Sequence, residues 1–112
     1  MNPDINKKPW SNYEEWLLYL NHKLYGNQWA IISKYIYGRT DNNIKNHWNS
    51  NMKKKLGNFY KRLIKVHEVY FNNNQNIDKF VESNIEKNLL TKLFENKNEL
   101  LLFNELSFSN LY

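Results

Sequence analysis

The chain has 112 residues, of which 41% are hydrophobic, and a formal net charge of +5. This length allows one domain, or a small domain with an extension. The sequence contains no cysteine, which excludes disulfides and thiolate metal sites, and its apolar runs are too short for a bilayer-spanning helix. The excess of basic side chains is compatible with an anionic partner but does not require one, and we expect no membrane association and no cofactor.

Charge is distributed unevenly along the chain. Residues 1–71 contain twelve basic and five acidic side chains, a net charge of +7, whereas residues 72–112 contain four and six, a net charge of −2. A basic first part and a mildly acidic second part predict two segments with different roles.

The first predicted helix follows an extended N-terminal arm, residues 1–9, which contains two prolines and two adjacent lysines. Ser11 and Glu14 have the spacing of a capping box, in which the hydroxyl and the carboxylate each accept a hydrogen bond from a backbone N–H at the helix start. Gly26 provides a stop signal that is common at helix C-termini. We therefore predict a helix from Ser11 to Tyr25.

A second helix is predicted over residues 28–37, and a tight turn over residues 38–40 separates it from a third. Thr40 is a good N-cap for this third helix, and Asp41 stands where the helix dipole favours an acid. Three short helices with short connections predict a compact all-α bundle, whose last two helices form a helix-turn-helix motif.

The third predicted helix has two different faces. Ile44, Trp48 and Met52 recur every four residues and form a stripe that can face a core. The opposite face carries amides and cations, namely Asn42, Lys45, Asn46, Asn49 and Lys53, and the helix ends in three lysines at residues 53–55. Such a face suits the DNA major groove, because Asn pairs with N6 and N7 of adenine while Lys reaches guanine or phosphate. The alternative is an ordinary solvated face.

Three tryptophans, Trp10, Trp29 and Trp48, are spaced 19 residues apart, one for each predicted helix. Each indole can bury on the order of 200 Å², which is enough to anchor the core of a unit of about 50 residues. We therefore predict that all three are core residues.

The caps, turns and tryptophans form a recognisable order of motifs. These motifs are Trp10-Ser11, Glu14-Glu15, Tyr25-Gly26-Asn27-Gln28-Trp29-Ala30, Gly38-Arg39-Thr40-Asp41-Asn42, Ile44-Lys45-Asn46-His47-Trp48-Asn49-Ser50 and Met52. Together they resemble a Myb DNA-binding repeat, and they are most similar to the last repeat of the tandem Myb proteins. The resemblance covers residues 3–56, and the N-terminal arm resembles the linker that joins this repeat to the one before it.

The resemblance implies a homeodomain-like helix-turn-helix fold whose third helix enters the major groove and reads a site containing AAC. The residues that match the family's base contacts are Lys45, Asn46, Asn49 and Ser50. The residues expected at phosphates are Lys8, Arg39, Asn42, Lys53 and Lys54, which would fix the register without reading sequence. For Asn42, a contact to a base stays open.

Three features depart from the family pattern. Only one repeat is visible, and because a linker-like sequence begins at Met1 we expect that a preceding repeat is missing from this chain. Tyr37 replaces the proline that is usual before Gly-Arg-Thr, which should loosen that turn. Four apolar residues occupy positions that are generally polar in the family, and these are Trp16, Leu20, Leu24 and Ile31.

We expect an exposed apolar face of this kind to be buried against other residues. Residues 57–71 have a helix-compatible apolar pattern, residues 72–76 form a polar linker, and residues 77–103 are typical of one long or two short amphipathic helices. We expect these helices to pack on the apolar face of the first helix. The alternatives are that they bind another transcription or chromatin protein, that they dimerise, or that they are disordered.

These observations divide the chain into a linker-like arm (residues 1–9), a Myb-type helix-turn-helix domain (residues 10–56) and a C-terminal helical extension (residues 57–112). We predict a nuclear transcription regulator that binds specific double-stranded DNA sequences. The alternative is a SANT-like module, which shares the fold and binds histone tails or partner proteins. The lysines of the third helix favour DNA, because its one acid, Asp41, lies at its start.

An enzyme is not expected. The three histidines, His22, His47 and His67, lie on separate predicted helices without a metal-ligand spacing, and no glycine-rich phosphate loop is present. We expect His22 and His47 to pack or form hydrogen bonds within the repeat. Glu14 and Glu15 are interpreted as acids that favour the helix start, and not as a catalytic pair.

Overall fold

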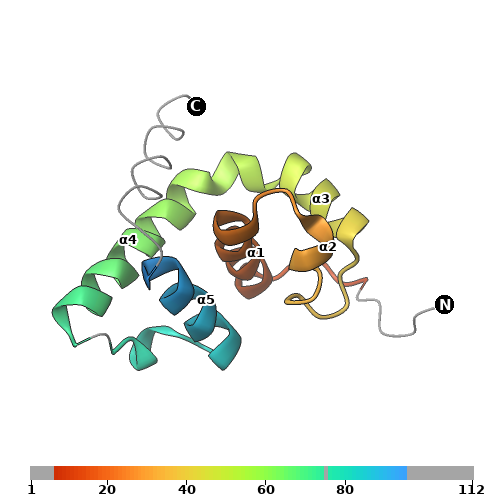
Figure 1. Ribbon diagram of the computed structural model, residues 1–112. Helices are drawn as coiled ribbons and strands as arrows, with labels where there is room; N and C mark the ends of the chain where they lie inside the picture. The colour runs from red at the N-terminus through yellow and green to blue at the C-terminus, as the bar shows by residue number, and fades with distance from the viewer. Residues whose placement is uncertain (1–6, 75, 96–112) are drawn as a thin grey trace. The chain divides into compact units, whose positions relative to one another are not determined.

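A computed structural model describes residues 7–74 and 76–95 of the chain, and this part of the chain forms helices and no strand (Figure 1). The helical fold agrees with the predicted all-α class. The chain divides into two compact units, residues 1–54 and residues 55–112. Within the described residues, no helix combines the length and the hydropathy that are needed to cross a bilayer.

The helix α1 comprises Asn12–Tyr25, so it ends at the predicted residue and begins one residue after the predicted start, with Ser11 as its N-cap. Its capping box is formed in full, because the Ser11 hydroxyl accepts from the Glu14 backbone N–H and the Glu14 carboxylate accepts from the Ser11 backbone N–H. Gly26 ends the helix with φ at 60°, a left-handed conformation that favours glycine. The residues from Glu15 to Asn21 are all buried, which leaves this stretch of α1 without an exposed face.

The helix α2 is much shorter than predicted, because it comprises only Trp29–Ile32. After this single turn, Lys34 and Tyr35 donate their backbone N–H groups to residues three positions earlier, a tighter pattern than that of an α-helix. Gln28 gives the helix no side-chain cap, and the two β-branched isoleucines have a modest helix propensity. The apolar pattern of residues 28–37 therefore predicted core positions correctly, since Ile32 and Ile36 are buried. It overestimated the length of the helix.

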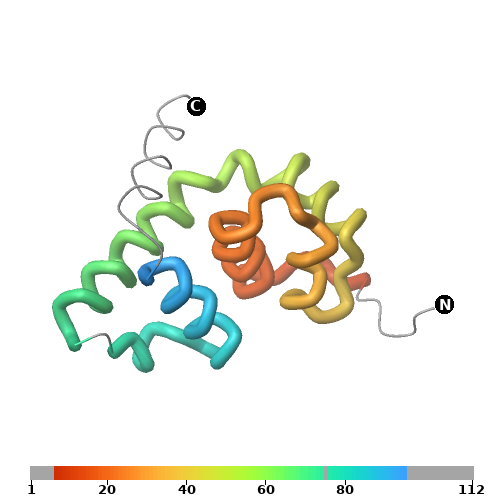
Figure 2. Tube along the Cα trace, in the orientation of Figure 1, coloured from red at the N-terminus to blue at the C-terminus, as the bar shows by residue number. Residues whose placement is uncertain are grey.

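The helix α3 comprises Asp41–Ser50 and begins as predicted, with the Thr40 hydroxyl accepting from the Asn43 backbone N–H. It ends earlier than predicted. The lysines at residues 53–55 do not belong to it, but to a separate 3-10 helix, η1, which comprises Met52–Lys55. Figure 2 shows how the chain turns back between α2 and α3 to bring these two elements together.

The three tryptophans are buried to different degrees. Trp48 has only 7% of its surface exposed, whereas Trp10 and Trp29 are partly exposed, so the prediction of three core tryptophans is fully met only by Trp48. Trp10 precedes the cap of α1, and Trp29 opens the single turn of α2, so both lie at element ends. The centre of the unit is filled instead by aliphatic and aromatic residues that include Leu18, Ile32, Ile36, Ile44 and Met52.

The second unit is also helical. It contains α4 (Leu56–Asn72), the 3-10 helix η2 (Asp78–Phe80) and α5 (Asn84–Glu95). The Phe94 ring of α5 lies 5.0 Å from the rings of both His67 and Tyr70 of α4, so the two helices share an aromatic contact. The helix predicted over residues 57–71 is confirmed, and the described part of 77–103 contains the 3-10 helix η2 and the α-helix α5. The remainder of that range, residues 96–103, lies outside the described residues.

Candidate nucleic-acid interface

The two faces of α3 differ in burial as the sequence predicts. Ile44 is fully buried, and Trp48 stacks on His22 of α1, with ring centroids 3.7 Å apart. The other face is exposed, and it consists of Asn42, Lys45, Asn46, Asn49 and Ser50. The buried face anchors the helix, while the exposed face presents amides, a cation and a hydroxyl. All four predicted base-contacting residues therefore lie together on one accessible surface.

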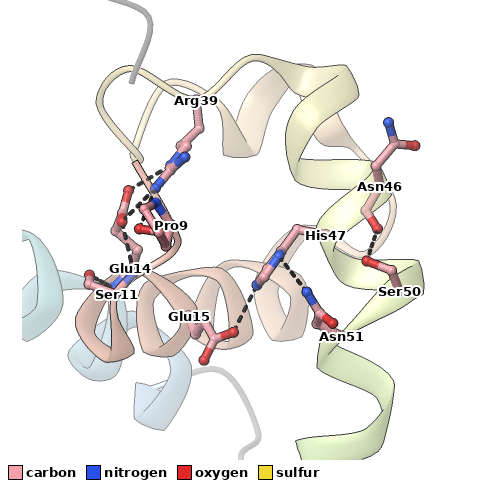
Figure 3. Close-up of polar contacts among 9 residues, drawn as sticks. All are labelled: Pro9, Ser11, Glu14, Glu15, Arg39, Asn46, His47, Ser50 and Asn51. Atoms are coloured by element: carbon pink, nitrogen blue, oxygen red, sulfur yellow. Dashed lines mark hydrogen bonds and ion pairs between the residues drawn. The ribbon is translucent and has the colours of Figure 1, made fainter. Parts of the chain in front are cut away.

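Asn46 is one of the exposed amides of this surface. Its side chain points away from α1 in Figure 3, and it has no hydrogen bond or ion pair with any other described residue. The Ser50 hydroxyl is already engaged, because it donates to the Asn46 backbone carbonyl at 2.8 Å. A hydroxyl that donates its hydrogen can still accept hydrogen bonds through its two lone pairs, so Ser50 is suited to meet a donor.

His47, the next residue, points in the opposite direction. Its Nε2 lies 2.8 Å from the Glu15 carboxylate of α1, and its Nδ1 lies 3.1 Å from the Asn51 amide nitrogen (Figure 3). This geometry fits an imidazole that donates from Nε2 to the carboxylate and accepts at Nδ1 from the amide. The expectation that His47 forms a hydrogen bond within the repeat is confirmed. The partner was missed, because Glu15 is 32 residues earlier in the chain.

Arg39 differs from its predicted role. Its side chain has a relative exposure of only 2%, and both Nε and Nη2 donate to the Glu14 carboxylate at 2.8 and 2.9 Å. Nη2 also donates to the Pro9 carbonyl at 3.2 Å (Figure 3). A guanidinium that is buried and donates to both a carboxylate and a backbone carbonyl has little left for a phosphate. We therefore remove Arg39 from the phosphate-contacting set and assign it a structural role.

The same contact changes the acidity of Glu14. Burial alone raises the pKa of this carboxyl, but the hydrogen bonds from Arg39 and from the Ser11 backbone outweigh burial and place the pKa below its ordinary value of 4.5. Glu14 thus has two roles: it caps α1, and it binds Arg39 in the turn before α3. Sequence reasoning identified only the capping function, because the spacing from Ser11 is local and the spacing from Arg39 is not.

Trp10 links these two polar contacts. Its ring is parallel to the His47 imidazole, with centroids 4.2 Å apart, and the Arg39 guanidinium carbon lies 4.7 Å from its centroid. The residue just before α1 therefore touches both α3 and the turn that precedes it. The arm that contains Lys8 is held at this point, since the Pro9 carbonyl accepts from Arg39.

The predicted phosphate-contacting residues other than Arg39 are all exposed. Lys53 and Lys54 lie on η1, directly after α3, and Lys8 lies on the arm. Asn42 lines a shallow, open pocket at the start of α3 together with Trp29, Asp41 and Lys45. In the sequence, these lysines therefore lie on both sides of the three-helix segment, before α1 and after α3. In the described part of the chain, no cluster of His, Asp or Glu side chains could hold a metal ion.

Comparisons with known proteins agree with this geometry. Residues 7–52 match the family described as the Myb-like DNA-binding domain. The chain is 53% identical over 60 residues to "Transcription factor MYB3R-1" of Arabidopsis thaliana, and the match covers 54% of the chain. It is 54% identical over 56 residues to "Myb-related protein A" of Xenopus laevis and 46% identical over 56 residues to "Myb-related protein B" of Gallus gallus, each match covering 50% of the chain.

These matches concern a small part of each relative, because the chain spans only 8% of the length of each of these three proteins. No solved structure matches the chain. The caps of α1 and α3, the exposed face of α3 and the matched segment nevertheless coincide in the same stretch of sequence. Residues 7–52 of this chain therefore match the Myb-like DNA-binding domain family.

Proposed function

We propose that the chain binds specific sequences of double-stranded DNA by placing α3 in the major groove, and that it acts as a transcription regulator in the nucleus. The site that we propose contains AAC. Base contacts come from Lys45, Asn46, Asn49 and Ser50. Phosphate contacts come from Lys8, Asn42, Lys53 and Lys54.

The observation that carries this proposal is the division of α3 into an anchored face and an exposed amide face. A recognition helix must be held by the protein on one side, because an unanchored helix would not present its side chains in a fixed register. Ile44 and Trp48 supply that anchor. The exposed asparagines have the donor and acceptor geometry that pairs with N6 and N7 of adenine, and Lys45 supplies a donor for the guanine acceptors.

The cations support a second part of the proposal, the fixing of register on the DNA backbone. Lys53 and Lys54 follow the C-terminal end of α3, and Lys8 precedes the cap of α1. Contacts to phosphate from both positions would hold the helix in the groove without reading sequence. Each such contact releases counterions, so binding should weaken steeply as salt is raised.

The relatives support the regulatory part of the proposal. One of them is named a transcription factor, and the matched segment contains α1, α2 and α3. Since this segment is a small fraction of each relative, the regulatory role and the nuclear location of this chain are inferred from the likeness of one domain. The helices of the C-terminal unit are available to bind other transcription or chromatin proteins.

A selection from random double-stranded DNA tests the proposal. The full chain is expected to enrich a site that contains AAC, and its preference for that site over a scrambled duplex should persist at two salt concentrations. Binding of both duplexes with equal affinity at both salt concentrations would contradict sequence-specific recognition. Binding to histone-tail peptides without measurable binding to DNA would replace the proposal by the interaction-module alternative.

A further inference from the structure

A row of polar side chains follows the outer face of α4, beyond the segment that matches the Myb-like family. Asn58, Lys61 and Lys65 are spaced by three and four residues, the spacing of neighbours on one side of an α-helix, and all three are exposed. We call these three residues the α4 stripe. It contains no apolar side chain.

The buried face of α4 fixes where the stripe points within the second unit. The buried residues are Leu56, Tyr60, Leu63, Val66 and Tyr70. Lys61 and Lys65 each lie two residues from Leu63, and two residues correspond to a rotation of about 200° around an α-helix. The two lysines therefore lie on the side of α4 opposite to its apolar core and are available to a partner.

The two lysines also differ from other cations of the second unit. Arg62 lies 3.8 Å from the buried Glu86 carboxylate, and Lys87 pairs with Asp78 at 2.6 Å. Lys61 and Lys65, in contrast, have no ion pair with any described residue, although Glu68 follows Lys65 at a spacing of three. Within the described residues, no carboxylate pairs with either ammonium group.

The stripe continues a longer basic segment of the chain. Residues 52–67 contain six basic and no acidic side chains, and they begin at η1, where Lys53 and Lys54 follow α3. Lys61 follows Lys54 by seven residues in the sequence.

We infer that the α4 stripe is a second DNA-backbone contact, in which Lys61 and Lys65 bind phosphates that flank the sequence read by α3. The inference rests on the proposed function for its partner, but it concerns residues outside the family segment. The observations favour DNA over an anionic bilayer, because the stripe has amide and ammonium groups but no apolar side chain that could enter lipid. It supplies additional affinity to a chain in which one Myb-like segment reads the bases.

The test compares Lys61→Gln/Lys65→Gln with a matched control, Lys79→Gln/Lys92→Gln, in the full chain. Both variants lose two charges from exposed lysines of the second unit. Binding is measured on matched and scrambled duplexes with long flanks, from 50 to 200 mM salt. The stripe variant should reduce the slope of log K against log salt by up to about 1.8, which amounts to roughly tenfold less affinity loss across this range. Its ratio of matched to scrambled binding should equal that of the wild type.

Several results would overturn the inference. A slope equal to that of the control variant would show that Lys61 and Lys65 do not contact phosphate. Loss of binding to phosphatidylserine vesicles, with an unchanged slope on DNA, would assign the stripe to a membrane surface. If the wild type does not distinguish matched from scrambled DNA, the proposed sequence-specific function fails, but the two slopes still decide the role of the stripe. Circular dichroism of both variants verifies that α4 remains folded.

Discussion

Glu15 and His47 join α1 to α3 through a contact of 2.8 Å between the carboxylate Oε2 and the imidazole Nε2. Both side chains are largely shielded from solvent, with relative exposures of 6% and 10%. Because His47 directly follows Asn46, a contact that fixes the direction of His47 also fixes the direction of Asn46 on the other face of α3. This pair therefore positions the recognition face, although neither residue lies on that face.

Replacing His47 by Ala should reduce the free energy of unfolding by about 1–3 kcal/mol, because the shielded Glu15 carboxylate loses its hydrogen bond from the imidazole. It should also weaken binding of the matched duplex at a temperature where the variant remains folded. His47→Gln is the informative comparison, since its amide N–H can donate to Glu15 in place of Nε2. Thermal unfolding and DNA titration of both variants measure the two effects. Equal losses for Ala and Gln would count against positioning through this hydrogen bond.

Replacing Arg39 by Met should lower the free energy of unfolding by roughly 3 kcal/mol, because it leaves the Glu14 carboxylate without its two-pronged partner. The salt dependence of DNA binding should stay unchanged, since the wild-type guanidinium is bound within the protein. Urea unfolding and a salt titration measure the two quantities. A shallower salt slope with unchanged stability would instead return Arg39 to the phosphate-contacting residues.

The stability of the first unit should depend on pH through Glu14. Its pKa in the folded chain lies below the ordinary value of 4.5, so the unfolded chain takes up a proton first as the pH falls. The contribution of Glu14 is therefore complete above the unfolded pKa and is lost as the pH falls through the folded pKa. Urea unfolding between pH 7 and pH 3 measures this loss. Glu14→Gln should flatten the curve, and an equally steep curve in that variant would assign the acid sensitivity to another group.

Asn46→Ala should reduce discrimination at one adenine of the site by about 1–3 kcal/mol and leave the fold intact. The reason is that the exposed Asn46 side chain makes no hydrogen bond or ion pair with another described residue that its removal would break. Competition titrations with duplexes changed at single positions measure the discrimination. Asn88→Ala on α5 is a suitable control, because it makes the same change at another exposed helical position. An equal loss on matched and scrambled DNA would argue against base reading by Asn46.

Lys53→Ala should weaken binding to all duplexes alike and reduce the salt slope by about 1, because an exposed lysine on η1 would contact phosphate and not a base. The measurement is the same salt titration on matched and scrambled duplexes. A changed sequence preference with an unchanged slope would move Lys53 from the phosphate contacts to the base contacts.

Local sequence signals were sufficient wherever the physics is local. The capping box of Ser11 and Glu14, the stop at Gly26 and the Thr40 cap each involve residues within one helical turn, and each boundary that they predict is present. The length of α2 was not predictable in this way. Its apolar residues are spaced as in an α-helix. After Ile32, however, the backbone hydrogen bonds join residues three apart, which is a tighter pattern than that of an α-helix.

The sequence by itself determined the helical class, the caps of α1 and α3 and the exposed amide face of α3, because these depend on spacing within single helices. Only the tertiary structure decided that Arg39 binds Glu14 and that His47 binds Glu15, since these partners are 25 and 32 residues apart. A charged side chain has the same sequence signature whether it binds phosphate or a buried carboxylate. The folded chain decides between them, because burial makes an unpaired charge too costly and an internal partner becomes the stable solution.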